Sequence, residues 1–302
     1  MKKDGYPDDF AAAANAAAAV VGSIIPPSIP MVFIAMLTNL SVGKLLFGGL
    51  VPGLMMGVAM CVICWGKTRK MDIHEEDQEN PTWRGFWAVL KESWLSLIAP
   101  LIIVVGVLTG FVTITEVAIL AAAYVLFIGA VVYKTIKPRD ILNAFRGAAL
   151  FSSSIMALFS IVGIFSWLIA VEEVGKTLAA AVLAWNLKPW MFLLLVNVWF
   201  LLMGMIMDAI PAMTIFVPVL LPIAEGLGIA PVHFGVVVVA NLMIGLLTPP
   251  VGGLLFVESK LSGVSFDRLS RAVFPFLASL IVILLLITYI PSLVTFVPSL
   301  FF

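Results

Sequence analysis

The feature that most constrains this chain is the long apolar stretch Gly204–Val257, which is interrupted at two places that contain proline. Asp208 and Pro211 interrupt its first part, and Thr248-Pro249-Pro250 interrupts its second part. Proline lacks a backbone donor, clashes with the preceding turn of a helix, and turns the residue before it away from the α conformation. Each place therefore ends one helix and begins another, and main-chain groups lose their helical partners there.

The composition places these breaks in a membrane. Of 302 residues, 62% are hydrophobic and 11% are charged, whereas a soluble domain carries roughly 25% charged residues. An interrupted helix at lipid depth is tolerated only where its backbone is buried in protein or lines a wet cavity. Because a carboxylate, Asp208, lies beside one break, the sequence predicts an all-α polytopic membrane protein with an ion or substrate site at this stretch.

The other apolar runs predict further membrane segments. A half-helix over Phe10–Ile25 breaks at Pro26-Pro27-Ser28 and continues as Ile29–Thr38. Thr115 is the expected N-cap of the span Glu116–Tyr133, because threonine caps helices well. The remaining expected elements are the spans Leu45–Trp65, Ser96–Phe111, Met191–Met207 and Phe274–Ile290, the apolar region Ala148–Val171, the short arm Val174–Leu187, and the interfacial helix Trp83–Ser93.

Other chemistries find little support. Cys61 and Cys64 form a CxxC motif inside an apolar run, but no second pair or nearby histidine completes a zinc site. The two histidines, His74 and His233, have no metal-ligand spacing. A membrane enzyme would need a nucleophile–base pair or an HExxH-like motif, and neither is present. The net charge of zero and the lack of a basic tract do not indicate nucleic-acid binding.

Two segments of the chain resemble each other at a nearly constant sequence offset of 223 or 224. Repeats with helix breaks in corresponding positions are the best pointer in a sequence to a transporter's binding site. The matched pairs are Ile25-Pro26-Pro27-Ser28 with Thr248-Pro249-Pro250-Val251, Met31-Val32-Phe33 with Leu254-Leu255-Phe256, Leu40-Ser41 with Val264-Ser265, Lys44-Leu45 with Arg268-Leu269, and Pro52 with Pro275.

The charges predict that the two repeats are inverted. Basic residues at 67–70 and 134–139 mark cytoplasmic loops by the positive-inside rule. Leu45–Trp65 should therefore run from outside to inside. Its counterpart Phe274–Ile290 follows Lys260, Arg268 and Arg271, and should run from inside to outside. The C-terminus is then expected in the periplasm.

With these features, the chain resembles the large membrane subunit of tripartite ATP-independent periplasmic (TRAP) transporters. The clearest resemblance is in Gly245-Leu246-Leu247-Thr248-Pro249-Pro250-Val251-Gly252, and it extends over the whole chain. The other motifs that carry it are Lys3-Asp4-Gly5-Tyr6, Ile24-Ile25-Pro26-Pro27-Ser28-Ile29-Pro30, Leu50-Val51-Pro52-Gly53, Thr113-Ile114-Thr115-Glu116, Gly204-Met205-Ile206-Met207-Asp208 and Pro231-Val232-His233-Phe234-Gly235.

The resemblance implies an inner-membrane secondary transporter that imports small organic acids (C4-dicarboxylate, sialic or sugar acids), is coupled to Na⁺, and works by an elevator-like motion. It also implies two partners, a small four-helix membrane subunit and a periplasmic substrate-binding protein, and no cofactor besides the coupling ion. The chain then divides into residues 1–66 (rest of the first repeat), 67–92 (cytoplasmic loop and interfacial helix) and 93–302 (second repeat). The second repeat would hold scaffold spans at 96–133, a transport part at about 140–262 and a last span at 274–290.

The strongest candidate for a sodium ligand is Asp208, because a charge at bilayer depth costs at least about 2.5–3.5 kcal/mol and normally has a partner or a function. The alternative is an interfacial aspartate that caps the helix after Pro211. Thr248, Pro249 and Pro250 would act through the carbonyls of a half-helix that ends near Leu247, or would form a structural kink only.

The remaining candidates support this site. Pro26, Pro27 and Ser28 would form a mirror site in the first repeat. Gly204 and Gly245 are assigned to the same site, because glycine permits close approach of the backbone. Asn241, like Asn197, is expected either to be a ligand or to form hydrogen bonds between helices. The half-helices that begin near Val251 and Ile29 present backbone amides at their N-termini, which would suit a carboxylate substrate. Glu172 and Glu173 are expected to be interfacial charges.

Two other functions stay open at this point. One is a stand-alone sodium/dicarboxylate or citrate symporter, which would share inverted repeats and proline breaks but need no binding protein. The other is a non-functional truncated remnant, because members of the family are longer and begin with further spans, and a counterpart of Asp208 would lie near position −15. The chain is thus expected to lack about 120 N-terminal residues of the family pattern.

The DNA directly upstream of the Met1 codon distinguishes these interpretations. Three or four further apolar spans and a glycine- and serine-rich break encoded in frame would favour the transporter. An in-frame stop codon without such spans would favour the remnant.

Overall fold

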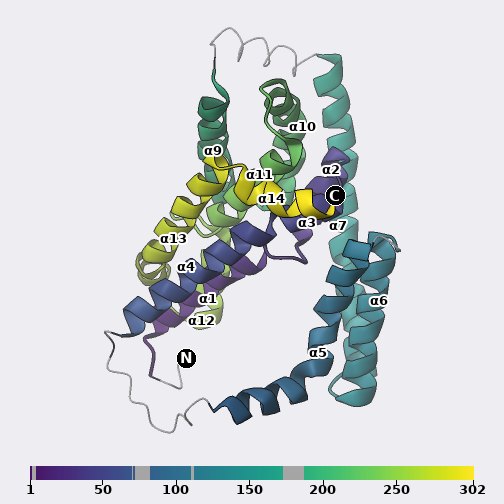
Figure 1. Ribbon diagram of the computed structural model, residues 1–302, viewed down its shortest axis with the longest axis vertical. Coiled ribbons are helices and arrows are strands. Elements are labelled where there is room, and N and C mark those ends of the chain that lie inside the picture. The colour runs from purple at the N-terminus through teal and green to yellow at the C-terminus, as the bar shows by residue number, and fades with distance from the viewer. Residues whose placement is uncertain (2–4, 70, 72–81, 110–111, 173–186) are drawn as a thin grey trace. The chain divides into compact units, whose positions relative to one another are not determined.

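The computed structural model describes the chain except residues 2–4, 70, 72–81, 110–111 and 173–186. Every regular element among the described residues is a helix (Figure 1). The elements are α1 Asp8–Gly22, α2 Ile29–Thr38, α3 Val42–Gly48, α4 Leu50–Thr68, α5 Trp83–Thr109, α6 Ile114–Phe127, the π-helical turn η2 Ile128–Val132, α7 Pro138–Val171, α9 Pro189–Ile206, α10 Ala209–Gly226, α11 Pro231–Gly245, α12 Gly253–Ser262, α13 Phe266–Tyr289 and α14 Ser292–Phe301.

Several of these helices are long and apolar enough to cross a membrane. Five described segments meet that condition by length and composition: Val42–Thr68, Thr115–Val132, Pro189–Ile206, Ala209–Gly226 and Phe266–Tyr289. Helix α5 is bent by 62° between Gly85–Lys91 and Ser93–Gly106. The prediction of an all-α polytopic membrane protein is confirmed.

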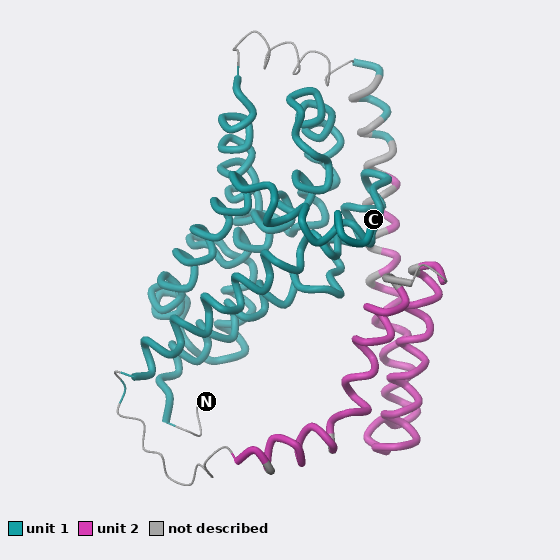
Figure 2. The backbone as a smooth tube through the Cα atoms, in the orientation of Figure 1, with its two compact units in different colours: residues 1–74, 161–302 teal, residues 75–160 magenta. Residues whose placement is uncertain are grey.

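The chain packs as two units (Figure 2). Unit 1 contains residues 1–74 and 161–302, and unit 2 contains residues 75–160. These units follow packing, whereas the predicted division into 1–66, 67–92 and 93–302 follows sequence repeats. That division stays a prediction.

In unit 2, the turn between α5 and α6 is closed by a capping box. The Thr113 hydroxyl oxygen accepts from the Glu116 amide (3.3 Å), and the Glu116 carboxylate accepts from the Thr113 amide (2.7 Å). The prediction that Thr115 is the N-cap is wrong. A glutamate three residues after the cap can reach back to the cap amide, and Glu116 has that spacing from Thr113 but not from Thr115.

In unit 1, the helix boundaries reproduce the repeat seen in the sequence. Both ends of α1 match those of α11 at the offset of 223 (8 and 231, 22 and 245), and both ends of α2 match those of α12 at the offset of 224 (29 and 253, 38 and 262). The start of α3 matches the start of α13 at the same offset of 224 (42 and 266). Even the caps correspond, because Asn39 and Gly263 end α2 and α12 in the left-handed conformation.

Helix contacts in unit 1 are reciprocal between the repeats. Helix α1 packs on α12 just as α11 packs on α2, and α1 packs on α13 just as α11 packs on α3. Helix α4 contacts α1, and its counterpart α13 contacts α11. Contacts in which i meets j and the image of i meets the image of j are the mark of a two-fold relation. The two repeats are therefore related by a pseudo-two-fold axis.

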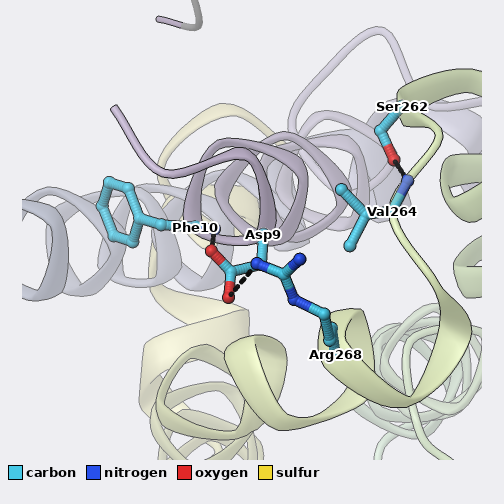
Figure 3. A network of polar contacts seen from close by, with 5 residues as sticks. All are labelled: Asp9, Phe10, Ser262, Val264 and Arg268. Atoms are coloured by element: carbon cyan, nitrogen blue, oxygen red, sulfur yellow. Dashed lines mark hydrogen bonds and ion pairs between the residues drawn. The ribbon is translucent and has the colours of Figure 1, made fainter. Parts of the chain in front are cut away.

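The contact between α1 and α13 joins the two repeats directly. The Asp9 carboxylate lies 3.6 Å from the Arg268 guanidinium, and it also accepts from the Phe10 amide at 2.9 Å (Figure 3). Because the Arg268 side chain is 66% exposed, this ion pair contributes at most about 1 kcal/mol. The Phe10 ring packs 6.1 Å from that of Phe276, so apolar burial supplies most of the stability of this contact.

Helices α4 and α13 pack against each other and run in opposite directions (Figure 1). In that view α4 ends at the lower left, where α13 begins, and α13 ends beside α9. Equivalent helices that run in opposite directions are what an inverted repeat requires. The arrangement supports the orientation that the charges predict.

We expect alkaline phosphatase, which is active only in the periplasm, to be active when fused after Phe302 and inactive when inserted after Arg69. The physical reason is that the basic residues around Arg69 hold that loop in the cytoplasm. Measuring the activity in intact cells checks this, with a green fluorescent protein series as the complementary control. Equal phosphatase activity at both places would contradict inversion.

Candidate ion and substrate site

The first break of the second repeat lies between α9 and α10. Helix α9 ends at Ile206, Met207 and Asp208 are extended, and α10 begins at Ala209. Asp208 is exposed, and it is the N-cap of α10, because its Oδ1 accepts from the Ala209 amide at 2.6 Å. The capped helix begins before Pro211, which lies in the first turn where no amide donor is needed. Asp208 thus caps the helix, and its carboxylate also faces the space between the helix ends.

The second break lies between α11 and α12. The prediction of free carbonyls at the end of α11 is wrong for three of them. The Ile244 carbonyl accepts from the Leu247 amide (3.0 Å) and the Thr248 hydroxyl (2.8 Å), and the Gly245 carbonyl accepts from the Thr248 amide (2.9 Å). The Leu246 carbonyl accepts from Leu254 in α12 (3.1 Å). Buried main-chain groups must find partners, and the turn supplies them locally.

The two breaks meet at one cleft of about 370 Å³. The Gly252 amide at the start of α12 donates to the Met205 carbonyl near the end of α9 (3.2 Å), which joins the two breaks directly. One charged side chain, that of Asp208, lies among the lining residues. They are Gly204, Met205, Ile206, Met207, Asp208, Leu246, Val251, Gly253, Leu254 and Val257.

Glycine sets the distance between the walls of this cleft. A Cβ atom on Gly245 would lie 2.7 Å from the Gly204 Cα, and one on Gly204 would lie 2.7 Å from the Leu242 carbonyl oxygen. Gly252 adopts φ +53°, which favours glycine. Gly204 and Asp208 therefore line the cleft together, and Gly245 packs against Gly204 without lining it. Thr248, Pro249 and Pro250 lie in the turn between α11 and α12 and are not among the lining residues.

Asn241 lies outside the cleft, in a buried polar chain. Its side-chain amide donates to Asn197 Oδ1 in α9 and to the Val237 carbonyl, both at 2.8 Å. Asn197 in turn donates to the Thr288 hydroxyl in α13 at 3.0 Å. The Asn241 Oδ1 atom is buried and has no hydrogen-bond partner in the described part of the chain. Of the two interpretations of Asn241, the structure supports helix–helix hydrogen bonding.

Sequence reasoning missed two members of this buried region. Thr288 completes the chain from α11 to α13, and His233 contacts the Ile287 carbonyl through Nε2 at 2.8 Å. Each of these residues could have been noticed in the sequence as a polar residue in an apolar helix. The sequence did not indicate which other helix would supply the hydrogen-bond partner of Thr288 or of His233.

Pro26, Pro27 and Ser28 form a break in the first repeat, between α1 and α2. Ser28 is 1% exposed and is the N-cap of α2; its hydroxyl donates to the Ser23 carbonyl at 2.5 Å and its oxygen accepts from the Met31 amide at 3.3 Å. The Pro26-Pro27 and Pro249-Pro250 peptide bonds are both cis. These three residues do not line the cleft of the second repeat, so the mirror site stays a prediction.

Two predictions at the end of α7 fall near or beyond the described residues. Glu172 directly follows α7 and is exposed, as expected of an interfacial charge. Glu173 and most of the expected arm Val174–Leu187 lie outside the described residues.

Gly245→Ala should destabilise the protein by about 1–3 kcal/mol, because the added methyl group meets backbone atoms that cannot move aside. Gly226→Ala is the matched control, since a Cβ there meets nothing within 4 Å. Thermal unfolding in detergent measures both variants. Equal unfolding temperatures for the two would show that the walls of the cleft are not closely packed.

Comparison with known proteins identifies the family. The model of the tripartite ATP-independent periplasmic transporter DctM component matches residues 1–293. The chain is 34% identical to the sialic acid TRAP transporter large permease of Vibrio cholerae and to the C4-dicarboxylate large permease of Pseudomonas aeruginosa, over 100% and 99% of this chain and 70% of each relative. It is 37% identical to the isethionate TRAP transporter permease of Oleidesulfovibrio alaskensis, of which it spans 46%. These relatives are transport proteins and not enzymes. The chain therefore belongs to the DctM family of TRAP transporter large permeases.

Proposed function

We propose that this chain carries small organic acids across the inner membrane, coupled to Na⁺, at the cleft where the α9–α10 and α11–α12 breaks meet. The observation that carries the proposal is this meeting of two helix breaks around Asp208. Relatives are named for sialic acid, C4-dicarboxylates, 2,3-diketo-L-gulonate and isethionate. The first three substrates are carboxylates and isethionate is a sulfonate, so all of them are small organic anions. A periplasmic binding protein and a small four-helix membrane subunit would complete the transporter.

Sodium would bind between Asp208 and the turn after α11. The Asp208 carboxylate supplies a hard oxygen, and the Thr248 hydroxyl oxygen still has lone pairs after donating to Ile244. The Gly245 and Leu246 carbonyls each accept one hydrogen bond and keep a second acceptor site. The C-terminal end of α11 also adds partial negative charge.

The carboxylate of the substrate would bind at the start of α12. The amide of Gly253 lines the cleft and donates to no acceptor in the described part of the chain. Helix N-termini of this kind bind anions through their amides and their dipole. No basic side chain lines the cleft, so this amide and the dipole of α12 would supply the main attraction within it.

Coupling would follow from the charge of the cleft. Its one charged lining residue is acidic and none is basic, so an anionic substrate alone meets repulsion. A bound Na⁺ removes that repulsion, and by linkage the substrate then raises the affinity for Na⁺ by the same factor. The elevator motion would carry the loaded cleft across the membrane.

The stand-alone sodium/dicarboxylate or citrate symporter is the weaker alternative. It would share the repeats and the broken helices. The match to the DctM component, together with relatives that are themselves TRAP permeases, favours the tripartite system.

Asp208→Asn should weaken Na⁺ binding at least roughly tenfold, because the variant loses the Coulomb attraction between the carboxylate and the cation, which is about 4 kcal/mol at 4 Å near a protein surface. Asparagine caps helices as well as aspartate does, so α10 is kept. The measurement is the unfolding temperature of the purified chain as Na⁺ replaces K⁺ at constant ionic strength, because a bound ion stabilises the folded state.

Glu225→Gln, which removes an exposed carboxylate at the far end of α10, is the control and should leave the Na⁺ dependence unchanged. A Na⁺ titration that is the same for Asp208→Asn and the original chain would overturn the assignment of Asp208. Uptake by the chain with its partner subunits then tests the organic-acid substrate separately.

A further inference from the structure

Glu258 is a buried carboxylate that the proposed site does not use. It lies on α12 and is 7% exposed, and its Oε2 atom accepts from the Asn15 side-chain amide of α1 at 2.9 Å. Asn15 is neutral, and in the described part of the chain no basic side chain forms an ion pair with Glu258. A carboxylate inside a membrane protein normally has a charged partner or a function, and here the structure supplies only the neutral amide.

The charged residues of the neighbouring helices do not neutralise Glu258. Helix α12 packs on α1 and α13. Besides Glu258, the charged residues of these three helices are Asp8, Asp9, Lys260, Asp267, Arg268 and Arg271. Of the three basic residues, Arg268 pairs with Asp9, and Lys260 and Arg271 are exposed. Because solvent and salt screen exposed charges, none of them cancels the negative charge of Glu258.

The pseudo-two-fold axis shows that packing alone does not require this polar pair. At the offsets of 223 and 224, Asn15 and Glu258 correspond to Val238 of α11 and Ile34 of α2. Both equivalent residues are fully buried, and α11 packs on α2 as α1 packs on α12. The same helix contact is thus built from apolar side chains in its other copy. Since burying a charge costs free energy that an apolar pair does not cost, packing does not account for Glu258.

Glu258 lies one turn beyond the wall of the cleft. Leu254 lines the cleft, and Glu258 follows it by four residues, on the same side of α12 and about 6 Å further along the helix axis. Cα–Cβ bonds in a helix tilt toward its N-terminus, and the N-terminus of α12 lines the cleft through Gly253. Glu258 therefore stands close behind the cleft without being one of its lining residues.

We propose that Glu258 is a positioning residue for the cation: its negative charge strengthens Na⁺ binding in the cleft without contacting the ion. This inference rests on the proposed Na⁺ site and adds a second carboxylate to it. Charges attract each other more strongly through protein than through water, because the local dielectric constant is lower. The Asn15 amide holds the carboxylate in place from α1. Because Ile34 occupies the equivalent position, the break of the first repeat lacks this charge.

Glu258→Gln tests the charge and keeps the hydrogen bond, because the glutamine side-chain oxygen can still accept from Asn15. In a Na⁺ titration of the unfolding temperature, with K⁺ replaced at constant ionic strength, we expect the midpoint at an at least fivefold higher Na⁺ concentration. Glu258→Asp keeps the charge and should leave the midpoint within twofold of the original. Asp267→Asn, which removes an exposed carboxylate of α13, is the matched control and should not move the midpoint.

A double variant separates the charge from packing. Asn15→Val combined with Glu258→Ile places on α1 and α12 the residues that α11 and α2 have at the equivalent positions. Its unfolding temperature in K⁺ should equal or exceed that of the original chain, because apolar replacement of a buried polar pair is often neutral or stabilising. Its Na⁺ midpoint should rise as in Glu258→Gln.

The outcomes distinguish this inference from the proposed Na⁺ site. Loss of the Na⁺ dependence in Asp208→Asn, with an unchanged midpoint in Glu258→Gln, would overturn the role of Glu258 and leave the site intact. If Na⁺ does not stabilise the original chain, or if both variants titrate as the original does, the site and this role fail together. A lower unfolding temperature of the double variant in K⁺, with an unchanged Na⁺ midpoint, would assign the pair to packing and overturn the proposal.

Discussion

The structure depends on the need of main-chain groups in an apolar environment to find hydrogen-bond partners inside the protein. The prolines and Asp208 stop regular helices at the breaks of both repeats, and the helix ends there find their hydrogen-bond partners in different ways. Ser28 caps α2 through its hydroxyl, Asp208 caps α10, and the last carbonyls of α11 accept from Thr248 and Leu254. The Gly252 amide reaches across to Met205. The same solutions create polar surface within the bundle, where the proposed ion and substrate carboxylate would bind.

Close packing then makes these ends one site. Gly204 and Gly245 let α9 and α11 touch at their backbones, and Asn197, Asn241 and Thr288 tie those helices to α13 a few turns away. Buried hydrogen bonds of this kind hold three helices in one arrangement. The cleft is thus bordered by helices that are joined to one another, which suits the elevator motion proposed for this chain.

The pseudo-two-fold axis explains the regularity of unit 1 and reveals where its repeats differ. Helix ends match at offsets of 223 and 224, and helix contacts are reciprocal. Yet α11 is buried from His233 to Gly245, whereas α1 exposes Ala18, Ala19 and Gly22. The two repeats therefore share helix ends and helix contacts, but not the burial of these equivalent faces.

The sequence by itself determined where the helix breaks lie, because prolines and caps act locally; Ile29–Thr38 has the predicted bounds, and both breaks lie where the prolines are. Other bounds were wrong: the predicted Trp83–Ser93 and Ser96–Phe111 form one helix, α5, and the predicted span Leu45–Trp65 is divided between α3 and α4. It failed at Thr115, where Thr113 has the spacing that Glu116 needs for a capping box. Only the tertiary structure decided that Asp208 shares a cleft with Gly253, and that Asn241 bonds Asn197 instead of lining it. Those outcomes depend on which faces of distant helices meet, and local rules do not specify a contact between residues 44 positions apart.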